Sequence, residues 1–314
     1  MKRLALYVFW EKDGVVRDYV TYYLKALKKI AEDIIVIANG GVNPEGEQTL
    51  KNIGVELLKR ENHGIDFGAW QDAIQQKGWD TLKHYDQLIL CNCSTYGPVY
   101  PFQDMFNEME NRHCDFWGIT KHPAVNTNFI PDNPETQILE HIQSYFIVFN
   151  KTAMMSEAFK DWWETLIPTD NYAEEVGLHE TKLTHYLEKR GLKSDVYTSK
   201  GNFRYLPEEQ ITRFSPDEIL LKGHAPLVKR KIFIQYLSDP NQDFEQGILT
   251  IKQHIKAHTE YPFALIQKDF LLNTQRPFLK EAKYHLLSHL TFGKRKKHYL
   301  KKAFSQSKKN LLLS

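Results

Sequence analysis

The chain of 314 residues is 42% hydrophobic and 25% charged, a composition that suits a folded protein with one large domain or one domain and an appendage. Its net charge of +2 conceals an asymmetry, because residues 294–314 include eight basic residues and no acidic one, which leaves the remainder mildly acidic. Three cysteines without a disulfide spacing, no apolar run of membrane-spanning length and no signal-peptide pattern predict a cytoplasmic protein.

The first third of the sequence alternates between strand-like and helix-like segments. Apolar or β-branched runs of strand length are followed by stretches whose apolar residues recur at helical spacing. Such an alternation predicts a parallel sheet with helices on both faces. The predicted strands cover 4–10, 33–38, 55–58 and 88–90, and the predicted helices cover 16–30, 44–53 and 67–85.

The next segments continue the same domain. Helices are predicted at 102–112, 156–167 and 172–190, the last ended by Gly191, and strands at 114–120, 140–150 and 192–198. The loop 121–136 contains three prolines and is long for a compact domain, which is typical of a functional lid or a mobile insertion.

The pattern changes beyond about Pro207. Segments 244–258, 262–273 and 277–290 have helical spacing interrupted by prolines, and no strand pattern accompanies them. We therefore predict an α/β domain over residues 1–206 and a helical C-terminal extension with a basic tail over 207–314.

The stretch YDQLILCNCSTYGPVYPF, residues 85–102, predicts a ligand crevice. Its apolar run ends in Asn92, Cys93 and Ser94, and ligands of open α/β sheets bind beyond the carboxyl ends of the strands. Asn92 and Ser94 can bind phosphate or sugar hydroxyls, or weakly a hydrated metal, but this strand end has no carboxylate. The alternative is a polar strand end that hydrogen-bonds the Gly97–Pro98 turn.

A second polar strand end lies at Asn62–Gly68. Gly64 and Gly68 allow the backbone to approach a ligand, and the helix that follows directs amide N–H groups toward an anion. Asp66 is placed to accept hydrogen bonds from a base or a sugar. The alternative is that Asp66 only caps the helix and that the glycines only serve the turn.

Several common motifs are missing. The sequence has no Gly-x-x-x-x-Gly-Lys phosphate loop, no Gly-x-Gly-x-x-Gly after the first strand, no His-Glu-x-x-His and no Gly-x-Ser-x-Gly. P-loop nucleotide hydrolysis, dinucleotide redox chemistry, zinc proteolysis and serine hydrolysis therefore lose support.

The chain resembles the rhamnan synthesis protein F family of bacterial polysaccharide glycosyltransferases over roughly residues 4 to 200. The matching segments are Tyr7-Val-Phe-Trp10 with Asp13-Gly14 and Asp18-Tyr19-Val20, Asn62-x-Gly64-x-Asp66-Phe67-Gly68-Ala69-Trp70, Asn92-x-Ser94-x-Tyr96-Gly97-Pro98, Asp115-Phe-Trp-Gly118 and His141-Ile-Gln-Ser-Tyr-Phe146.

The resemblance implies a GT-A-like (Rossmann-like) fold and a nucleotide-sugar donor, with dTDP-rhamnose the expected type. It also implies a growing glycan or lipid-linked acceptor. The family's usual Asn-Asp-Ser is Asn92-Cys93-Ser94 here, so a requirement for Mg²⁺ or Mn²⁺ stays open.

The implied fold distributes the polar residues between donor and acceptor. The nucleotide would face Phe9 to Asp13 at the first strand end and Asn62, Gly64 and Asp66 in the loop, and the diphosphate and sugar would face Asn92 and Ser94. His141, Gln143 and Tyr145 alternate along the predicted strand 140–150, so they are expected to share one face and to bind the acceptor. The alternative is an edge strand with solvated polar groups.

Transfer with inversion needs a general base. Glu175 and Glu174, near the start of the predicted helix 172–190, resemble the acidic pair of inverting GT-A enzymes. We favour Glu175, with Glu174 or Glu180 as rivals, because a helix N-terminus keeps a carboxylate ionised. The alternative is that the first turn of this helix is acidic for helix stability alone.

Two basic segments complete the predictions. Lys229 and Arg230, with nearby His224, can clamp the donor diphosphate, or they form a solvated basic turn. In the tail, Tyr299, Leu300, Ala303 and Phe304 share a helical face among lysines, which is typical of a helix at an anionic membrane surface. A disordered tail is the alternative, and no recognition motif favours nucleic acid.

Together these observations predict a glycosyltransferase, of the rhamnosyltransferase type, that works at the cytoplasmic face of the membrane. Three alternatives stay open: a non-catalytic scaffold of polysaccharide assembly, a polyol-phosphate transferase with a CDP-activated donor, and a nucleic-acid-binding protein.

Overall fold

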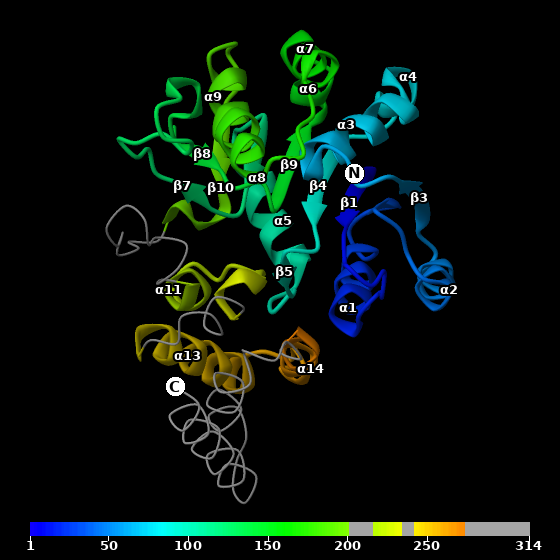
Figure 1. The fold of residues 1–314 in the computed structure, drawn as a ribbon, viewed down its shortest axis with the longest axis vertical. Helices are drawn as coiled ribbons and strands as arrows, with labels where there is room; N and C mark the ends of the chain where they lie inside the picture. Colours follow the sequence, from blue (N-terminus) through cyan, green and yellow to red (C-terminus); the bar gives the residue numbers. More distant parts are fainter. Residues whose placement is uncertain (201–215, 234–241, 274–314) are drawn as a thin grey trace, which may run out of the picture. The chain divides into compact units, whose positions relative to one another are not determined.

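A computed structural model describes residues 1–200, 216–233 and 242–273 (Figure 1). The chain forms two compact units. The first contains Met1–Cys93 and the chain from Pro101 to Gly201, and the second contains Ser94–Tyr100 and the described residues beyond 201. The expected boundary at 206 falls outside the described residues and stays a prediction.

The first unit is built on a seven-stranded sheet of order β10-β6-β9-β4-β1-β2-β3. β1 is parallel to β2 and β4, β2 to β3, and β10 to β6, whereas β9 is antiparallel to both of its neighbours. The predicted mostly parallel sheet flanked by helices is confirmed. The strands are β1 (Arg3–Phe9), β2 (Asp33–Asn39), β3 (Glu56–Arg60), β4 (Gln87–Asn92), β6 (Phe116–Gly118), β9 (Phe146–Asn150) and β10 (Ser194–Val196).

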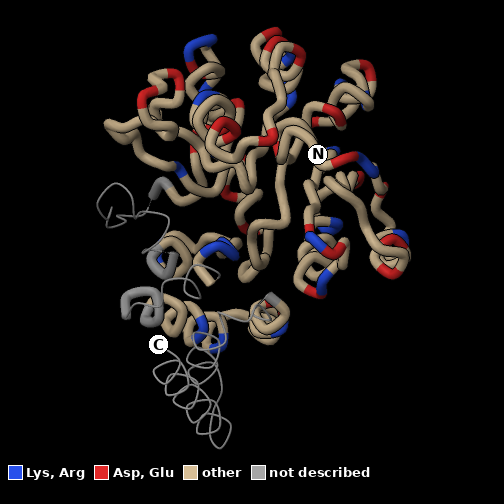
Figure 2. The backbone as a smooth tube through the Cα atoms, viewed as in Figure 1, with Lys and Arg blue, Asp and Glu red and all other residues tan. Residues whose placement is uncertain are grey.

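Helices cover both faces of this sheet, and most charged residues lie on the helices and loops around it (Figures 1 and 2). The core is aromatic: Phe67 stacks on Trp163 with 6.0 Å between ring centroids, and Trp70 is fully buried beside them. The helical segments are α1 (Asp18–Leu27), α2 (Pro44–Ile53), α3 (Ile65–Lys77), α4 (Trp79–Leu82), α5 (Phe102–Glu110), a 3₁₀ turn (Pro134–Thr136), α6 (Lys151–Met154), α7 (Glu157–Thr165), α8 (Tyr172–Glu174), a π-helix (Glu175–Glu180), α9 (Thr181–Glu188) and a 3₁₀ turn (Tyr197–Lys200).

The predicted strand 140–150 is wrong as a single strand. Only β8 (His141–Ile142), which pairs with β7 (Lys121–His122), and β9 are extended. Ile142, the last residue of β8, donates its backbone N–H to the Thr184 hydroxyl, and in the turn that follows Ser144 donates its backbone N–H to Glu180. These bonds replace a sheet partner, so the strand is interrupted.

The predicted helix 172–190 is also divided, because its middle is π-helical. Gly177 lies in the π-helix, and a Cβ atom there would meet Thr136 Cβ at 2.7 Å. The loop 121–136 therefore packs directly on the backbone of this segment.

The second unit is helical, with α11 (Pro216–Leu221), α13 (Gln242–His258) and α14 (Ala264–Asn273). The expectation of no strand is wrong: β11 (Val228–Lys229) pairs antiparallel with β5 (Thr95–Tyr96). Two-residue strands are too short to leave a period in the sequence. The predicted helix 277–290 and the basic tail lie outside the described residues. No helix of the described ranges is long and apolar enough to cross a membrane.

Gly118 in β6 provides a test of this packing. A Cβ atom at Gly118 would meet Ile142 Cγ2 at 2.2 Å, so Gly118→Ala is expected to destabilise the first unit by about 1–3 kcal/mol through overpacking. Urea unfolding measures the loss. Combined with Ile142→Ala, which removes the clashing methyl group, the loss should be smaller than the sum of the two single effects; additive losses would contradict this packing.

Candidate functional site

Asn92 and Asp66, predicted from two separate strand ends, meet in the structure. Asn92 is the last residue of β4 and its Nδ2 donates to Asp66 Oδ2 at 2.7 Å. Asp66 lies in the first turn of α3. The end of β4, which has no carboxylate of its own, therefore has the Asp66 carboxylate of α3 beside it.

The amide groups at the start of α3 are occupied by the protein itself. The N–H groups of Asp66 and Phe67 donate to Glu175 Oε1 at 3.1 and 3.0 Å, and that of Gly64 donates to Asp170 Oδ1 at 2.6 Å. These two carboxylates occupy the position at which a ligand anion was expected. The N-cap residue of α3 is Gly64, so the alternative in which Asp66 caps the helix is wrong.

Gly64 has a conformational reason to be glycine. Its φ is +68°, and a Cβ atom would meet Pro168 Cβ at 2.6 Å. The next residue, Ile65, also has a positive φ of 43°, which is rare and strained for a β-branched side chain. The backbone that presents Asp66 is therefore held in an unfavourable conformation by its surroundings.

Glu175, the favoured base, is only 4% exposed. Its second oxygen, Oε2, lies 3.3 Å from His179 Nδ1. Both oxygens therefore bind protein groups, so the geometry favours a structural task for Glu175. Of its rivals, Glu174 accepts from Thr169 Oγ1 at 2.5 Å, and Glu180 Oε1 accepts from the N–H and Oγ of Ser144, both at 2.9 Å.

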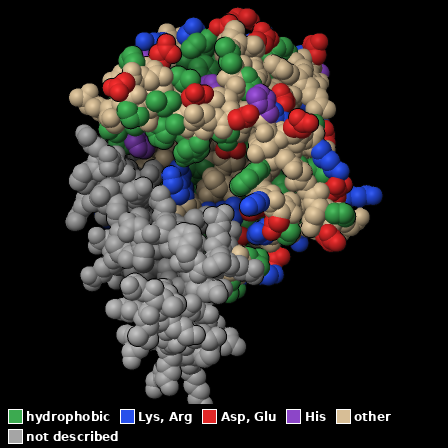
Figure 3. Space-filling model, in the orientation of Figure 1, with side chains coloured by type: hydrophobic (Ala, Val, Ile, Leu, Met, Phe, Trp, Pro, Cys, Tyr) green, Lys and Arg blue, Asp and Glu red, His purple; other side chains and the backbone are tan. Residues whose placement is uncertain are grey.

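The electrostatics of Asp66 differ from those of an ordinary aspartate. Burial first, and then the negative charge of Glu175, raise the pKa of Asp66 to about 7, although the hydrogen bond from Asn92 lowers it. A carboxyl group with a pKa near neutrality can accept and release protons under physiological conditions. Acidic and histidine side chains lie close together on the surface of this region, near α3 and α8 (Figure 3).

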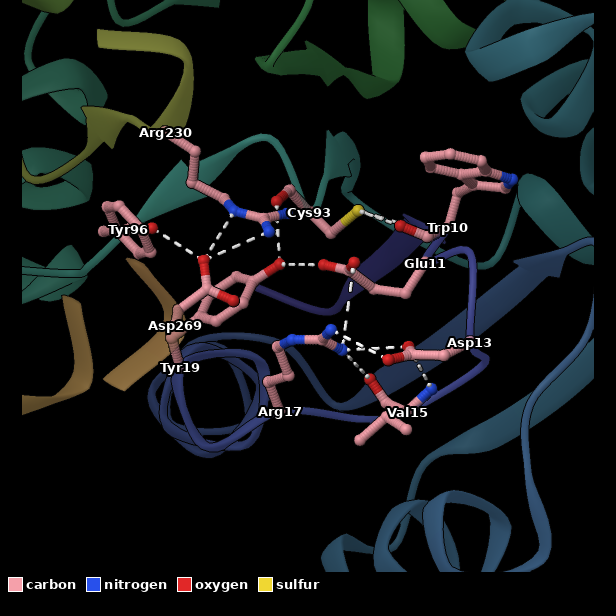
Figure 4. A network of polar contacts seen from close by, with 10 residues as sticks. All are labelled: Trp10, Glu11, Asp13, Val15, Arg17, Tyr19, Cys93, Tyr96, Arg230 and Asp269. Carbon is pink, nitrogen blue, oxygen red and sulfur yellow. Dashed lines mark hydrogen bonds and ion pairs between the residues drawn. The ribbon is translucent and has the colours of Figure 1, made fainter. Parts of the chain in front are cut away.

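Hydrogen bonds to Arg17 and Cys93 hold the segment that follows β1 (Figure 4). Phe9 is fully buried, and exposed Asp13 pairs with Arg17, whose hydrogen bonds lower the pKa of Asp13. Cys93 Sγ lies 3.4 Å from both the backbone N and O of Trp10, whose side chain is 49% exposed. Trp10 lies in the segment Phe9 to Asp13 that is expected to face the nucleotide, and it also belongs to the first matching segment.

The three predicted acceptor residues do not form a row on one strand face. His141 lies in β8, whereas Gln143 and Tyr145 lie in the turn before β9, and all three are buried. Thr120 Oγ1 lies 2.8 Å from Gln143 Oε1 and 2.7 Å from the Tyr145 hydroxyl. The solvated edge strand considered as an alternative is therefore wrong as well.

The predicted phosphate clamp lies in the second unit. The Arg230 guanidinium is buried and binds Asp269 Oδ2 at 3.1 Å, and the Tyr96 hydroxyl donates to the same oxygen at 2.7 Å (Figure 4). The Arg230 N–H donates to the Ser94 carbonyl, and Lys229 lies in β11. A solvated basic turn is therefore wrong for Arg230, whose charge is balanced within the unit.

Metal ligation gets no support from side-chain clustering in the described part of the chain. No group of three or more His, Cys, Asp or Glu residues in these ranges is arranged to hold a metal ion. Asn92 and Asp66 are too few for a dedicated protein cage.

The sequence model of the rhamnan synthesis protein F family matches residues 34–306 of this chain. The chain belongs to this family. A curated relative, the uncharacterized protein y4gN of Sinorhizobium fredii, is 22% identical to this chain over 216 residues. The match covers 69% of this chain and 52% of y4gN, so the chain spans about half the length of that relative.

Solved structures with a similar arrangement include three enzymes. They are the 4-diphosphocytidyl-2C-methyl-D-erythritol synthase of Anaerococcus prevotii (11% identity, 62% of this chain and 86% of that chain, TM-score 0.36), the core-mannan synthase A of Aspergillus fumigatus (10%, 64% and 74%, 0.35) and the glucosyl-3-phosphoglycerate synthase of Mycobacterium tuberculosis (9%, 64% and 84%, 0.35).

Glu175→Ala is expected to destabilise the first unit by about 2–3 kcal/mol, because two amide groups at the start of α3 lose a charged acceptor. Glu175→Gln keeps a carbonyl acceptor and should lose less. Urea unfolding measures both changes. Glu174→Ala, next to it in sequence, serves as the control; equal losses at 174 and 175 would contradict the capping role.

Asp66→Asn is expected to stabilise the folded chain at high pH. The folded state keeps the Asp66 proton up to about pH 7, whereas the unfolded chain releases it near 3.8, so stability falls as the pH rises between these values. Asparagine cannot ionise, and its advantage should grow by about 2 kcal/mol from pH 5 to pH 8. Calorimetry at the two pH values measures this, with exposed Asp80→Asn as the control. A difference that does not depend on pH would show that Asp66 is ionised throughout.

Proposed function

We propose that this chain is a GT-A-like glycosyltransferase that moves a sugar from a nucleotide-sugar donor to a growing cell-surface polysaccharide or lipid-linked glycan. The observation that carries the proposal is membership of the rhamnan synthesis protein F family. The family's description, rhamnan synthesis, favours rhamnose as the sugar, and we propose dTDP-rhamnose as its donor.

The proposed donor site lies at the carboxyl ends of β1 and β4. It contains the segment Phe9–Asp13, the loop residues Asn62 and Gly64, and the Asp66–Asn92 pair. The 2.7 Å bond between Asn92 and Asp66 supports this assignment, because two polar groups from separate segments converge beyond the sheet edge where ligands of α/β proteins bind. Phe9 is buried, whereas Asp13 is exposed and paired with Arg17, and this ion pair is proposed to face the nucleotide.

The remaining site assignments are also proposals. Ser94, Lys229 and Arg230 belong to the second unit, where the Arg230–Asp269 pair supports the backbone that carries Ser94. His141, Gln143 and Tyr145 are proposed to shape the acceptor region from within, since their side chains are buried.

Proton removal from the acceptor hydroxyl is assigned to the carboxylates around α3. Glu175 holds the first turn of the helix, and Asp66, with its pKa raised to about 7, is the group suited to take up the proton. Glu174, which is only partly buried, is the rival base. A divalent cation, if one takes part, would have to use donor phosphates as ligands in addition to protein groups.

The assay combines purified chain, a panel of nucleotide-sugars and CDP-polyols, and a lipid-linked acceptor. Release of nucleotide is measured with Mg²⁺, Mn²⁺ or EDTA. The same reactions with and without anionic vesicles test the proposed attachment of the basic tail to the inner membrane face. We expect turnover with dTDP-rhamnose and a loss of about 100-fold or more in Asp66→Asn, because a general base contributes about 10²–10⁴-fold.

Asp80→Asn is the matched control, because Asp80 is exposed and pairs with the surface lysine Lys83. No turnover of any donor would favour the non-catalytic scaffold, and turnover of CDP-polyols alone would favour the polyol-phosphate transferase. Full activity of Asp66→Asn with loss in Glu174→Gln would move the base to Glu174.

A further inference from the structure

A buried hydrogen-bonded series connects His179 to the Asp66–Asn92 pair. His179 Nδ1 lies 3.3 Å from Glu175 Oε2, and Glu175 Oε1 accepts the amide N–H of Asp66 at 3.1 Å. Asp66 in turn accepts from Asn92 at 2.7 Å. His179 is 7% exposed, and its ring packs on Phe67 with 5.6 Å between centroids, so the imidazole is fixed in place.

The backbone at the far end of this series is strained. Ile65 has φ 43°, a value that costs about 1–3 kcal/mol for a non-glycine residue and persists only where neighbouring groups impose it. The Asn39 side chain binds the Ile65 carbonyl at 2.9 Å, and Glu175 binds the next amide along the chain. Strain of this kind clusters at functional sites.

The segment that carries Glu175 and His179 is unusual as well. Both residues lie in the π-helix Glu175–Glu180, and such segments are rare and occur frequently at functional sites. The two side chains lie four residues apart and bond each other, so the π-helix places a carboxylate and an imidazole together beneath the first turn of α3.

We propose that His179 is a positioning residue for the transfer reaction: through Glu175 it holds the strained Ile65–Asp66 backbone and thereby the Asp66 carboxylate at the end of β4. This inference rests on the proposed function. Misplacement of a reacting group by about 1 Å can cost about 100-fold in rate, so a residue that touches neither donor nor acceptor can still set the rate.

The test compares His179→Phe, which keeps an aromatic ring on Phe67 but loses the bond to Glu175, with His179→Gln, which keeps a donor. We expect kcat to fall about 10-fold or more in His179→Phe with KM for the donor unchanged, and to recover to within about 3-fold of wild type in His179→Gln. His185→Phe, on α9, is the matched control.

Two further measurements separate positioning from stability. First, the acid limb of the pH–rate profile should shift by about half a unit or more in His179→Phe, because Glu175, whose charge helps raise the pKa of Asp66, loses its partner and can move; Glu180, Tyr172 and Cys91 are the other titratable groups that interact with Asp66. Second, the amides of Asp66 and Phe67 should exchange hydrogen faster, a readout that needs no activity.

A double variant tests the role of strain directly. Glycine adopts positive φ without cost, so in an Ile65→Gly background the His179→Phe change should reduce kcat by less than about 3-fold. Unchanged kcat, pH profile and amide exchange in His179→Phe would overturn the proposal, as would a His179→Gln variant as impaired as His179→Phe. If amide exchange rises in His179→Phe but wild type turns over no donor, the proposed function fails and only the support of the Asp66 backbone by His179 stands.

Discussion

The position of the Asp66–Asn92 pair at the carboxyl end of β4 depends on one buried carboxylate, that of Glu175, which lies against the N-terminus of α3. A helix N-terminus has amide groups without intrahelical partners and a partial positive charge, so a carboxylate placed there is stabilising. Here the carboxylate comes from a segment 109 residues further along the chain. The interaction therefore ties the second half of the domain to the first, and it does so next to the Asp66–Asn92 pair.

The same interaction has an electrostatic consequence for its neighbour. Glu175 is close enough to Asp66 to raise the proton affinity of that side chain, yet it is also the group that fixes the Asp66 backbone. A single residue thus fixes the backbone of the proposed base and, after burial, contributes most to the raised pKa of its side chain. The paired His179 completes the arrangement, because a buried carboxylate without a donor would be costly.

Sequence patterns predicted the parts of the fold that depend on local periodicity and on topology. The four strands predicted between residues 4 and 90 were found close to their expected positions, and the carboxyl ends of parallel strands brought Asp66 and Asn92 together. Contacts between side chains that lie far apart in the chain produce no periodicity in the sequence, so they were not predicted. The bond between Glu180 and Ser144 interrupts the expected strand, and Glu175 binds the amides that were predicted to face a ligand anion. Arg230, predicted to clamp the donor diphosphate, pairs with Asp269, which lies 39 residues further along the chain.

The order of the sheet also bears on how the chain behaves at high concentration. Strands β3 and β10 form its two edges, and an open edge is a template for pairing with another molecule. Both edges carry charge: Glu56 and Lys59 of β3 pair with Lys77 and Glu47, and Asp195 of β10 pairs with Arg112. A strand from a second copy that paired with either edge would have to remove water from these ion pairs, which is costly. The charged edges therefore protect the folded domain against edge-to-edge aggregation, although five of its strands are largely apolar and buried.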